Sequence, residues 1–341
     1  MPFALCGLFL FFISASSVNS SSTLDSILAV KVVDHIACEQ YDEALHLADS
    51  LRLDGEQLLP GWFLRASVLS SRLTDFEDEL DDEALLHACK QVQELCEIAI
   101  REGDRSAMTR FYLASVLGYL SFRAFKHDNL METISLAKKM GHLYEEAVSL
   151  DSTCWDAYLG LGAYYYHSSA RAGLLRRVGL ISDKRDEGIR LVKISAERGT
   201  FSRLAARSNL AWLAIDRERY DEAVQIITQL LEGYPNRRAF LWAMGRVRMK
   251  QRNWNEAIKI YETLLVSLRS EARNNHYNEI GCLHALAVAH GKLGDWRRVR
   301  KLTDEALAID LSSGVAERKK KDLDRLKKLR RQALSKTIDS D

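Results

Sequence analysis

A six-residue phrase that returns after 34 residues constrains the fold of this chain more than any other feature. Arg219–Val224 is echoed by Asn253–Ile258, and the same phrase appears upstream as Gln40–Leu45. Weaker copies occupy Arg185–Ile189 and Asp295–Val299. An aromatic residue, two polar residues and a small residue predict a helix entry at which a neighbouring helix can approach closely. A repeat of this length predicts stacked helical hairpins, because one hairpin cannot bury its apolar stripe alone.

The composition agrees with a helical protein. The 341 residues include only three prolines and 18 glycines, while 47% are hydrophobic and 28% are charged. This is a globular composition with less turn punctuation than a sheet protein needs. The formal net charge of +1 gives no global field that would select nucleic acid or a membrane as the partner. We therefore expect an all-α protein and no nucleic-acid partner.

Further positions around the phrase resemble the tetratricopeptide-repeat family, whose unit is about 34 residues of paired antiparallel helices. The family places Leu-Gly and an aromatic residue on the first helix, then a small residue, an aromatic residue, Ala and a closing Pro. The matching residues are Tyr158, Leu161, Gly162 and Tyr165; Leu210, Ala211, Ala223 and Pro235; Leu241, Gly245, Ala257 and Tyr261; and Leu286, Ala287 and Ala306, with Val299 where Ala is expected. The resemblance implies a right-handed α-solenoid of antiparallel helix pairs, a TPR superhelix with a C-terminal capping helix.

The fit to the family varies along the chain. We expect a repeat domain over residues 21–311, with the best-fitting repeats at 155–311 and divergent repeats at 25–150, where helices 84–102 and 130–150 are long. The run from Gly160 through Gly173 to Ile189 is also similar to a segment of the tetratricopeptide-repeat-39 and inclusion-body-clearance group, and of exported bacterial repeat proteins. These groups have no enzymatic role to carry over.

The resemblance also implies where a partner would bind. In the family, side chains of the first helix of each pair project into the groove. The corresponding residues here are Tyr166, Asn209, Trp212, Trp242, Arg246 and Lys250. Aromatic rings beside Arg and Lys suit an extended peptide with carboxylate or aromatic groups. Alternatively, Trp212 and Trp242 belong to the core between repeats.

A carrier or sensor of a small or lipidic ligand is the second functional hypothesis. Its pocket would be lined by Tyr164, Tyr165 and Tyr166 and covered by residues 168–184. The sequence has no Gly-rich phosphate loop, no HExxH, no GxSxG and no CxxC. We therefore expect no enzymatic activity, no cofactor and no metal site.

Three segments interrupt the repeat. Asp75–Glu83 holds seven acids in nine positions. We favour a solvated acidic loop that starts the next helix near Asp81, over a site for a cation or a basic partner, because a Ca²⁺ loop needs a Gly that this run lacks. Residues 168–184 mix basic and apolar side chains and form either a lid or a longer, packed helix end. Residues 267–278 are polar, and a longer turn between helices is enough to explain them.

The C-terminal residues 312–341 are predicted to form a basic capping helix and tail. Residues 317–331 contain nine Lys or Arg and three acids, with Leu323, Leu326 and Leu329 in a narrow stripe. We favour a solvated cap that docks this stripe. The alternative is a basic amphipathic helix that contacts an anionic membrane or an acidic partner.

The N-terminal residues 1–20 resemble a secretory signal peptide. Phe3–Ile13 is apolar but too short to span a bilayer, and small residues follow it up to Ser20. We expect a periplasmic or extracellular protein, or a cytoplasmic one if this run is not a signal peptide.

Cys89 and Cys96 lie two helical turns apart, roughly 10 Å, which is beyond disulfide reach, so we predict buried free thiols.

Overall fold

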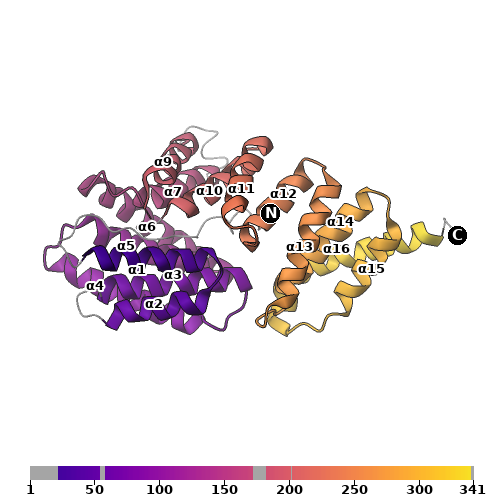
Figure 1. Cartoon of the computed structure of the whole chain (residues 1–341), viewed down its shortest axis with the longest axis horizontal. Helices are drawn as coiled ribbons and strands as arrows, with labels where there is room; N and C mark the ends of the chain where they lie inside the picture. The colour runs from indigo at the N-terminus through magenta and orange to yellow at the C-terminus, as the bar shows by residue number, and fades with distance from the viewer. Residues whose placement is uncertain (1–21, 54–57, 172–181, 201, 339–341) are drawn as a thin grey trace. The chain divides into compact units, whose positions relative to one another are not determined.

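The computed structural model of the chain describes residues 22–53, 58–171, 182–200 and 202–338, and all regular structure in these ranges is α-helical, as expected (Figure 1). The predicted signal peptide lies outside the described residues. The helices are α1 (Ser22–Ala37), α2 (Tyr41–Leu53), α3 (Leu58–Phe76), α4 (Asp82–Arg101), α5 (Ala107–Lys126), α6 (Leu130–Leu150), α7 (Ala157–Arg171), α9 (Arg185–Arg198), α10 (Arg203–Asp216), α11 (Tyr220–Gly233), α12 (Arg238–Lys250), α13 (Trp254–Ser270), α14 (Tyr277–Lys292), α15 (Trp296–Ala308) and α16 (Ser313–Ile338).

The chain forms two compact units. Within the described residues, the first unit holds α1, α2, most of α3, α4 to α7, α9 and α10. The second unit holds α11 to α16 together with the short segment Leu73–Glu79, which includes the last residues of α3. In the second unit α13 packs between α12 and α14 (Figure 1), and α14, α15 and α16 all contact one another.

The repeated phrase marks the start of a helix wherever it occurs. Helices α2, α11, α13 and α15 begin at the aromatic residue of the phrase, and α9 begins at Arg185, which occupies the same position. The helix entries predicted from the phrase are therefore confirmed. The long helices predicted near 84–102 and at 130–150 are also present, as α4 and α6.

One turn conformation precedes α2, α11, α13 and α15. The residue two positions before the helix start adopts a left-handed backbone, and the next N–H donates to the carbonyl five residues earlier, as from Asn253 to Arg248 (2.9 Å) and from Asp295 to His290 (3.0 Å). The same turn precedes α6, although the phrase is absent there. The left-handed residues are Glu39, Asp128, Glu218, Arg252 and Gly294.

Small residues at the fourth position of the phrase let helices pack closely. Ala44, Gly188, Ala223 and Ala257 are all buried. Helices α7 and α9 approach each other closely at this position, because a Cβ on Gly188 would lie 2.5 Å from the carbonyl oxygen of Gly162. The expectation that these positions lie between packed helices is confirmed.

The divergent N-terminal repeats share a buried hydrogen-bond motif. Ser67 and Ser115 each donate through Oγ to the carbonyl four residues earlier in their own helix. Each Oγ also lies near a tyrosine hydroxyl of another helix, that of Tyr119 (2.8 Å) for Ser67 and that of Tyr144 (2.9 Å) for Ser115. Because Oγ has already given its proton, the tyrosine donates.

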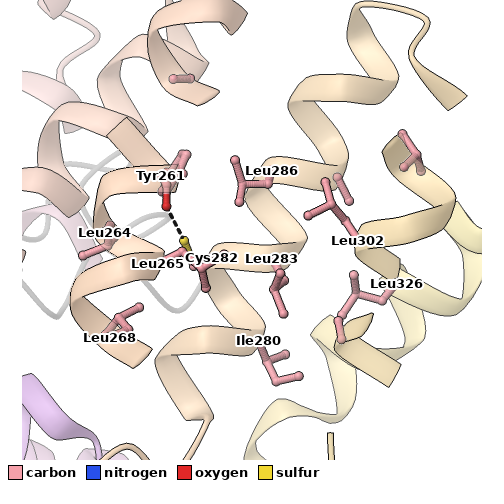
Figure 2. Packing of buried hydrophobic residues seen from close by; sticks show 14 of the residues in the cluster. Tyr261, Leu264, Leu265, Leu268, Ile280, Cys282, Leu283, Leu286, Leu302 and Leu326 are labelled. Atoms are coloured by element: carbon pink, nitrogen blue, oxygen red, sulfur yellow. Dashed lines mark hydrogen bonds between the residues drawn. The ribbon is translucent and has the colours of Figure 1, made fainter. Parts of the chain in front are cut away.

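The second unit has one continuous apolar core. Figure 2 shows leucines of α13, α14, α15 and α16 meeting around Leu283 and Leu286, and the Cys282 thiol donates to the carbonyl of Tyr261 (3.0 Å). Each fully buried leucine of this kind contributes about 1.5–3 kcal/mol. The core therefore commits one face of α14 to packing between α13 and α15.

Helix α16 packs against α14 and α15 through the leucine stripe, as a capping helix does. Leu326 is fully buried. The basic residues of α16 are not all solvated, because Lys319 is only 2% exposed. Its ammonium lies 3.9 Å from the centre of the Tyr277 ring and 3.3 Å from Asp322.

Candidate partner-binding surface

Three of the six predicted contact residues lie on one face of α12 in the second unit. Trp242, Arg246 and Lys250 follow one another at four-residue steps, which places them above one another on a helix. Trp242 and Arg246 are half-buried and Lys250 is exposed. We call these three residues the α12 stripe.

Trp242 serves both the stripe and the core. Its ring meets Tyr261 of α13 edge-on, with 5.7 Å between ring centres. Its outer edge lies close to Gly281 of α14, where a Cβ would sit 3.5 Å from the indole. The alternative that Trp242 packs between repeats therefore describes part of its surroundings, and the side chain as a whole is half-buried.

The other three predicted residues belong to the first unit. Tyr166 of α7 is fully buried, and its hydroxyl donates to Asp216 (2.6 Å). Asn209 of α10 is also buried, and Trp212 is half-buried. A partner could reach Tyr166 or Asn209 only by displacing neighbouring side chains.

The three consecutive tyrosines of α7 do not converge on one pocket. Tyr164 packs beside Gly141 of α6, and the Tyr165 hydroxyl donates to Glu145 (2.8 Å). Tyr166 turns toward Asp216, as described above. Because successive residues of a helix point about 100° apart, these rings reach different neighbours. Most of the segment 168–184, expected as a lid or a packed helix end, lies outside the described residues.

The second unit contains a basic site that the sequence interpretation missed. Its cations are Arg238 at the start of α12, Arg273 between α13 and α14, and Arg318 of α16. Two amides, those of Asn275 and Asn278, complete it. We call these five residues the arginine site.

The arginine site holds residues 75–78, which we call the acidic segment. Arg238 binds the carboxylate of Asp75 through two N–H groups, one of them the Nε at 3.0 Å. Arg273 binds Asp78 in the same bidentate way, at 3.0 and 2.8 Å. Arg318 donates to the main-chain carbonyl of Glu77 (2.8 Å).

The remaining contacts hold the backbone and the ring of the segment. Asn275 donates to the carbonyl of Glu77 (2.9 Å), and Asn278 donates to that of Asp75 (2.7 Å). The Phe76 ring lies beneath two guanidinium groups, 5.5 Å from that of Arg238 and 5.0 Å from that of Arg273. Such distances are typical of cation–π contacts.

The expected solvated acidic loop is therefore wrong for part of the run. Glu77 and Asp78 are less than a tenth exposed. A run of carboxylates enters a protein interior only when each charge is paired, and here arginines supply the pairing. The expected helix start is correct, since α4 begins at Asp82.

The next acids of the run are paired within the first unit. Arg72 makes a bidentate contact with Asp81, at 2.7 and 2.6 Å, and Arg123 makes one with Asp82, at 2.7 and 2.6 Å. Glu79 and Glu83 are exposed.

The Glu279 carboxylate holds the loop that carries Arg273 and Asn275 through hydrogen bonds. This side chain accepts hydrogen bonds from Arg269 (2.6 Å), Asn274 (3.0 Å) and His276 (2.7 Å). Burial alone would raise the pKa of Glu279, but these hydrogen bonds outweigh it and lower the pKa. The polar segment 267–278 is therefore an ordered loop, and its side chains bind the acidic segment 75–78, which belongs to another interruption of the repeat.

Other kinds of site are not assembled in the part of the chain that the structure describes. No three His, Cys, Asp or Glu side chains gather there to hold a metal ion. None of the described helices is long and apolar enough to cross a bilayer. Cys89 and Cys96 are buried free thiols, as predicted, and burial raises the pKa of Cys96 to about 12.

Comparisons with known proteins agree with this architecture. A sequence model described as tetratricopeptide repeat matches residues 204–273. Among solved structures, a chain of the APC/C heterotetramer Cut9–Hcn1 has a TM-score of 0.57 at 11% identity, covering 93% of this chain. This chain spans 57% of the length of that one.

Two further structures are similar at lower scores. YrrB, a TPR protein with an unusual peptide-binding site, has a TM-score of 0.41 at 16% identity, with coverage of 66% of this chain and 97% of YrrB. The C-terminal part of a TPR protein from Cytophaga hutchinsonii has a TM-score of 0.43 at 16% identity, with coverage of 85% and 98%. No curated protein matches the sequence. Residues 204–273 therefore match a tetratricopeptide-repeat model, and the described part of the chain has the all-helical fold of an α-solenoid of helix pairs.

Proposed function

We propose that this chain is a non-enzymatic scaffold that binds a protein or peptide partner on the first-helix side of its second unit. The observation that carries the proposal is the α12 stripe, an aromatic ring followed by two cations on one face of a helix. The opposite side of α12 is committed to the core. Its buried side chains are Phe240, Leu241, Met244 and Val247.

The stripe has the chemistry of a peptide-binding surface. The exposed part of Trp242 offers a rigid aromatic edge with few rotatable bonds, and Arg246 can bind a carboxylate bidentately. Lys250 adds a mobile positive charge at the end of the helix. An extended peptide that carries a carboxylate near an aromatic or apolar side chain fits this order.

The proposal is tested by removing the two charges of the stripe. Arg246→Ala/Lys250→Ala leaves Trp242, which also packs in the core, untouched. The matched control is Lys259→Ala/Arg300→Ala, which removes two exposed charges from α13 and α15, where they pair only with near neighbours in sequence. Such surface pairs contribute about 0–1 kcal/mol, so the control should keep the parent melting temperature, and the melting temperature of the stripe variant is measured beside it before binding is compared.

The partner is first identified by cross-linking and co-purification with the unchanged chain, and its Kd is then measured for each variant. Charged hydrogen bonds contribute about 1.5–3 kcal/mol each, so losing one or both predicts a Kd at least tenfold higher for the stripe variant. The control should bind as the parent does. Equal Kd values for all three proteins would refute binding at the stripe.

We further propose that the chain is exported and acts in the cell envelope or outside the cell. The support is the apolar run Phe3–Ile13 and the small residues that follow it. Mass spectrometry of the protein isolated from its native cells should find a mature chain that begins at Ser21. A mature chain that retains Phe3–Ile13 would contradict cleavage and, with it, this proposal.

A further inference from the structure

The arginine site holds the acidic segment in the way in which a receptor holds a peptide. Side-chain carboxylates of the segment are bound by paired N–H groups of Arg238 and Arg273. Its main-chain carbonyls accept hydrogen bonds from Arg318 and from two asparagine amides. Side-chain contacts of this kind select a sequence, while main-chain contacts add affinity whatever the sequence is.

The second unit positions the arginine site through residues outside the acidic segment. Arg238 also pairs with Glu271 (2.7 Å), and the guanidinium of Arg318 lies 4.6 Å from the centre of the Tyr277 ring. The Oδ1 of Asn275 accepts from the main-chain N–H of Tyr277 (3.0 Å). Arg238, Arg318 and Asn275 therefore have supports that would remain if the acidic segment left, and donors organised in advance lose less entropy when a ligand enters.

The occupant is the end of a helix and has a left-handed backbone at Glu77. Glu77 follows the last residue of α3 and has a φ of 55°. A non-glycine residue is strained in this left-handed region unless contacts hold it there. The contacts of Glu77 with the arginine site act together with the bond from its own N–H to the carbonyl of Leu73, which closes the end of α3.

We propose that the arginine site is a binding site for acidic peptide segments with an aromatic residue, of the pattern Asp-Phe-Glu-Asp, on a partner protein. Residues 75–78 fill the site in cis, and a partner segment of the same chemistry replaces them. This site is separate from the α12 stripe, so the proposal stands whether or not the stripe binds a partner.

The test uses a fluorescein-labelled peptide with the sequence of residues 70–80 and the full-length chain. In the unchanged chain the tethered segment competes at a high effective concentration, so the peptide should bind weakly. Asp75→Asn/Asp78→Asn in the chain replaces two charge-assisted bidentate contacts with weaker neutral ones and leaves the arginine site intact. Fluorescence anisotropy should then report a Kd for the peptide that is roughly tenfold or more lower.

A matched control removes two other charges from the same acidic run. Asp81→Asn/Asp82→Asn breaks bidentate contacts with Arg72 and Arg123 in the first unit. This variant should bind the peptide as weakly as the unchanged chain. Adding Arg273→Gln to the Asp75→Asn/Asp78→Asn chain should weaken the peptide by tenfold or more, because it removes the bidentate donor for the second aspartate.

Hydrogen exchange of the unchanged chain provides a second measurement that needs no variant. Saturating unlabelled peptide should speed exchange in residues 73–79, where the N–H of Glu77 is bonded to the carbonyl of Leu73, and should leave the core of α14 unchanged. A folded Asp75→Asn/Asp78→Asn chain that binds the peptide no better than the control would overturn the proposal. If that variant does not fold, unchanged exchange of residues 73–79 under saturating peptide would overturn it.

Discussion

The crossing of α7 and α9 gives the sharpest prediction about how the repeats pack. Gly188→Ala would place a methyl group 2.5 Å from the carbonyl oxygen of Gly162 and 2.9 Å from the backbone nitrogen of Tyr166. Ordinary contact begins near 3.4 Å, so the two helices must separate by roughly 0.9 Å (3.4 minus 2.5). Both obstructing atoms belong to the backbone, so no change of rotamer can relieve the clash.

The magnitude follows from two opposing effects. Overpacking costs about 1–3 kcal/mol, and a clash with rigid backbone belongs at the upper end of that range. Alanine is favoured over glycine within a helix by about 1 kcal/mol. The expected net loss is therefore about 2 kcal/mol, which lowers the melting temperature of a unit of this size by roughly 4–8 °C.

The same substitution at Gly233 is the matched control. This glycine ends α11, and a Cβ there would meet nothing within 4 Å. Gly233→Ala should therefore leave stability unchanged or raise it slightly. Urea unfolding, followed by circular dichroism and by hydrogen exchange in α7 and α9, measures both variants. If Gly188→Ala is as stable as Gly233→Ala, the close approach of these helices is not what holds the first unit together.

Three further predictions test the two units. Iodoacetamide at pH 8 should modify the exposed Cys38 and spare the buried thiols, which are Cys89, Cys96, Cys154 and Cys282. Burial raises the pKa of the Cys154 thiol, for example, to about 12, so little reactive thiolate forms at this pH. Labelling of any of these four thiols in the folded protein would contradict the packing. Glu279→Gln should lower the free energy of unfolding by about 1–3 kcal/mol at pH 7. Because the pKa of Glu279 is lowered in the folded state, the difference in stability between parent and variant should shrink as the pH falls below 4.5. A difference that does not depend on pH would refute the role of the Glu279 charge. Tyr144→Phe removes a hydroxyl bonded to buried Ser115 and should cost about 1 kcal/mol in urea unfolding, and an unchanged midpoint would show that this bond adds nothing.

Sequence periodicity predicted the architecture because the packing of a repeat is local. The phrase combines a bulky first residue with a small fourth residue, and both are needed where two helices meet, so helix starts such as Tyr220 and Trp254 could be read directly. The hairpin of α5 and α6 lacks the aromatic residue, but Leu130 and the buried Thr133 take the same two positions. The left-handed backbone of Asp128 shows that the turn between α5 and α6 has the same conformation as the turns before α2, α11, α13 and α15.

The arginine site could not be read from periodicity because it joins parts of the chain that are far apart in sequence. Asp78 and Arg273 lie 195 positions apart. Each falls in an interruption of the repeat, where the pattern carries no information about neighbours. The excess of acids in one interruption and the Arg and Asn side chains in another were the available signs. Opposite charge alone does not establish contact, because either interruption could equally have remained in solvent.

Placement of the predicted contact residues was limited for a related reason. A first-helix position says that a side chain lies near the groove, but burial depends on the size of its neighbours. Tyr166 lies beneath Arg217, and its hydroxyl is bonded to Asp216, whereas Lys250 at a corresponding helix face is exposed.

Site-specific photo-crosslinking tests the central claim, that the partner binds on the first-helix side of the second unit, most directly. A benzophenone amino acid is placed at Lys250 of α12 or, as the comparison, at Lys259 of α13, both of which are exposed in the structure. After irradiation in cells, we expect an adduct with the partner from position 250 and none from position 259. An adduct from position 259 with none from position 250 would place the partner on the second helices and refute binding at the first helices.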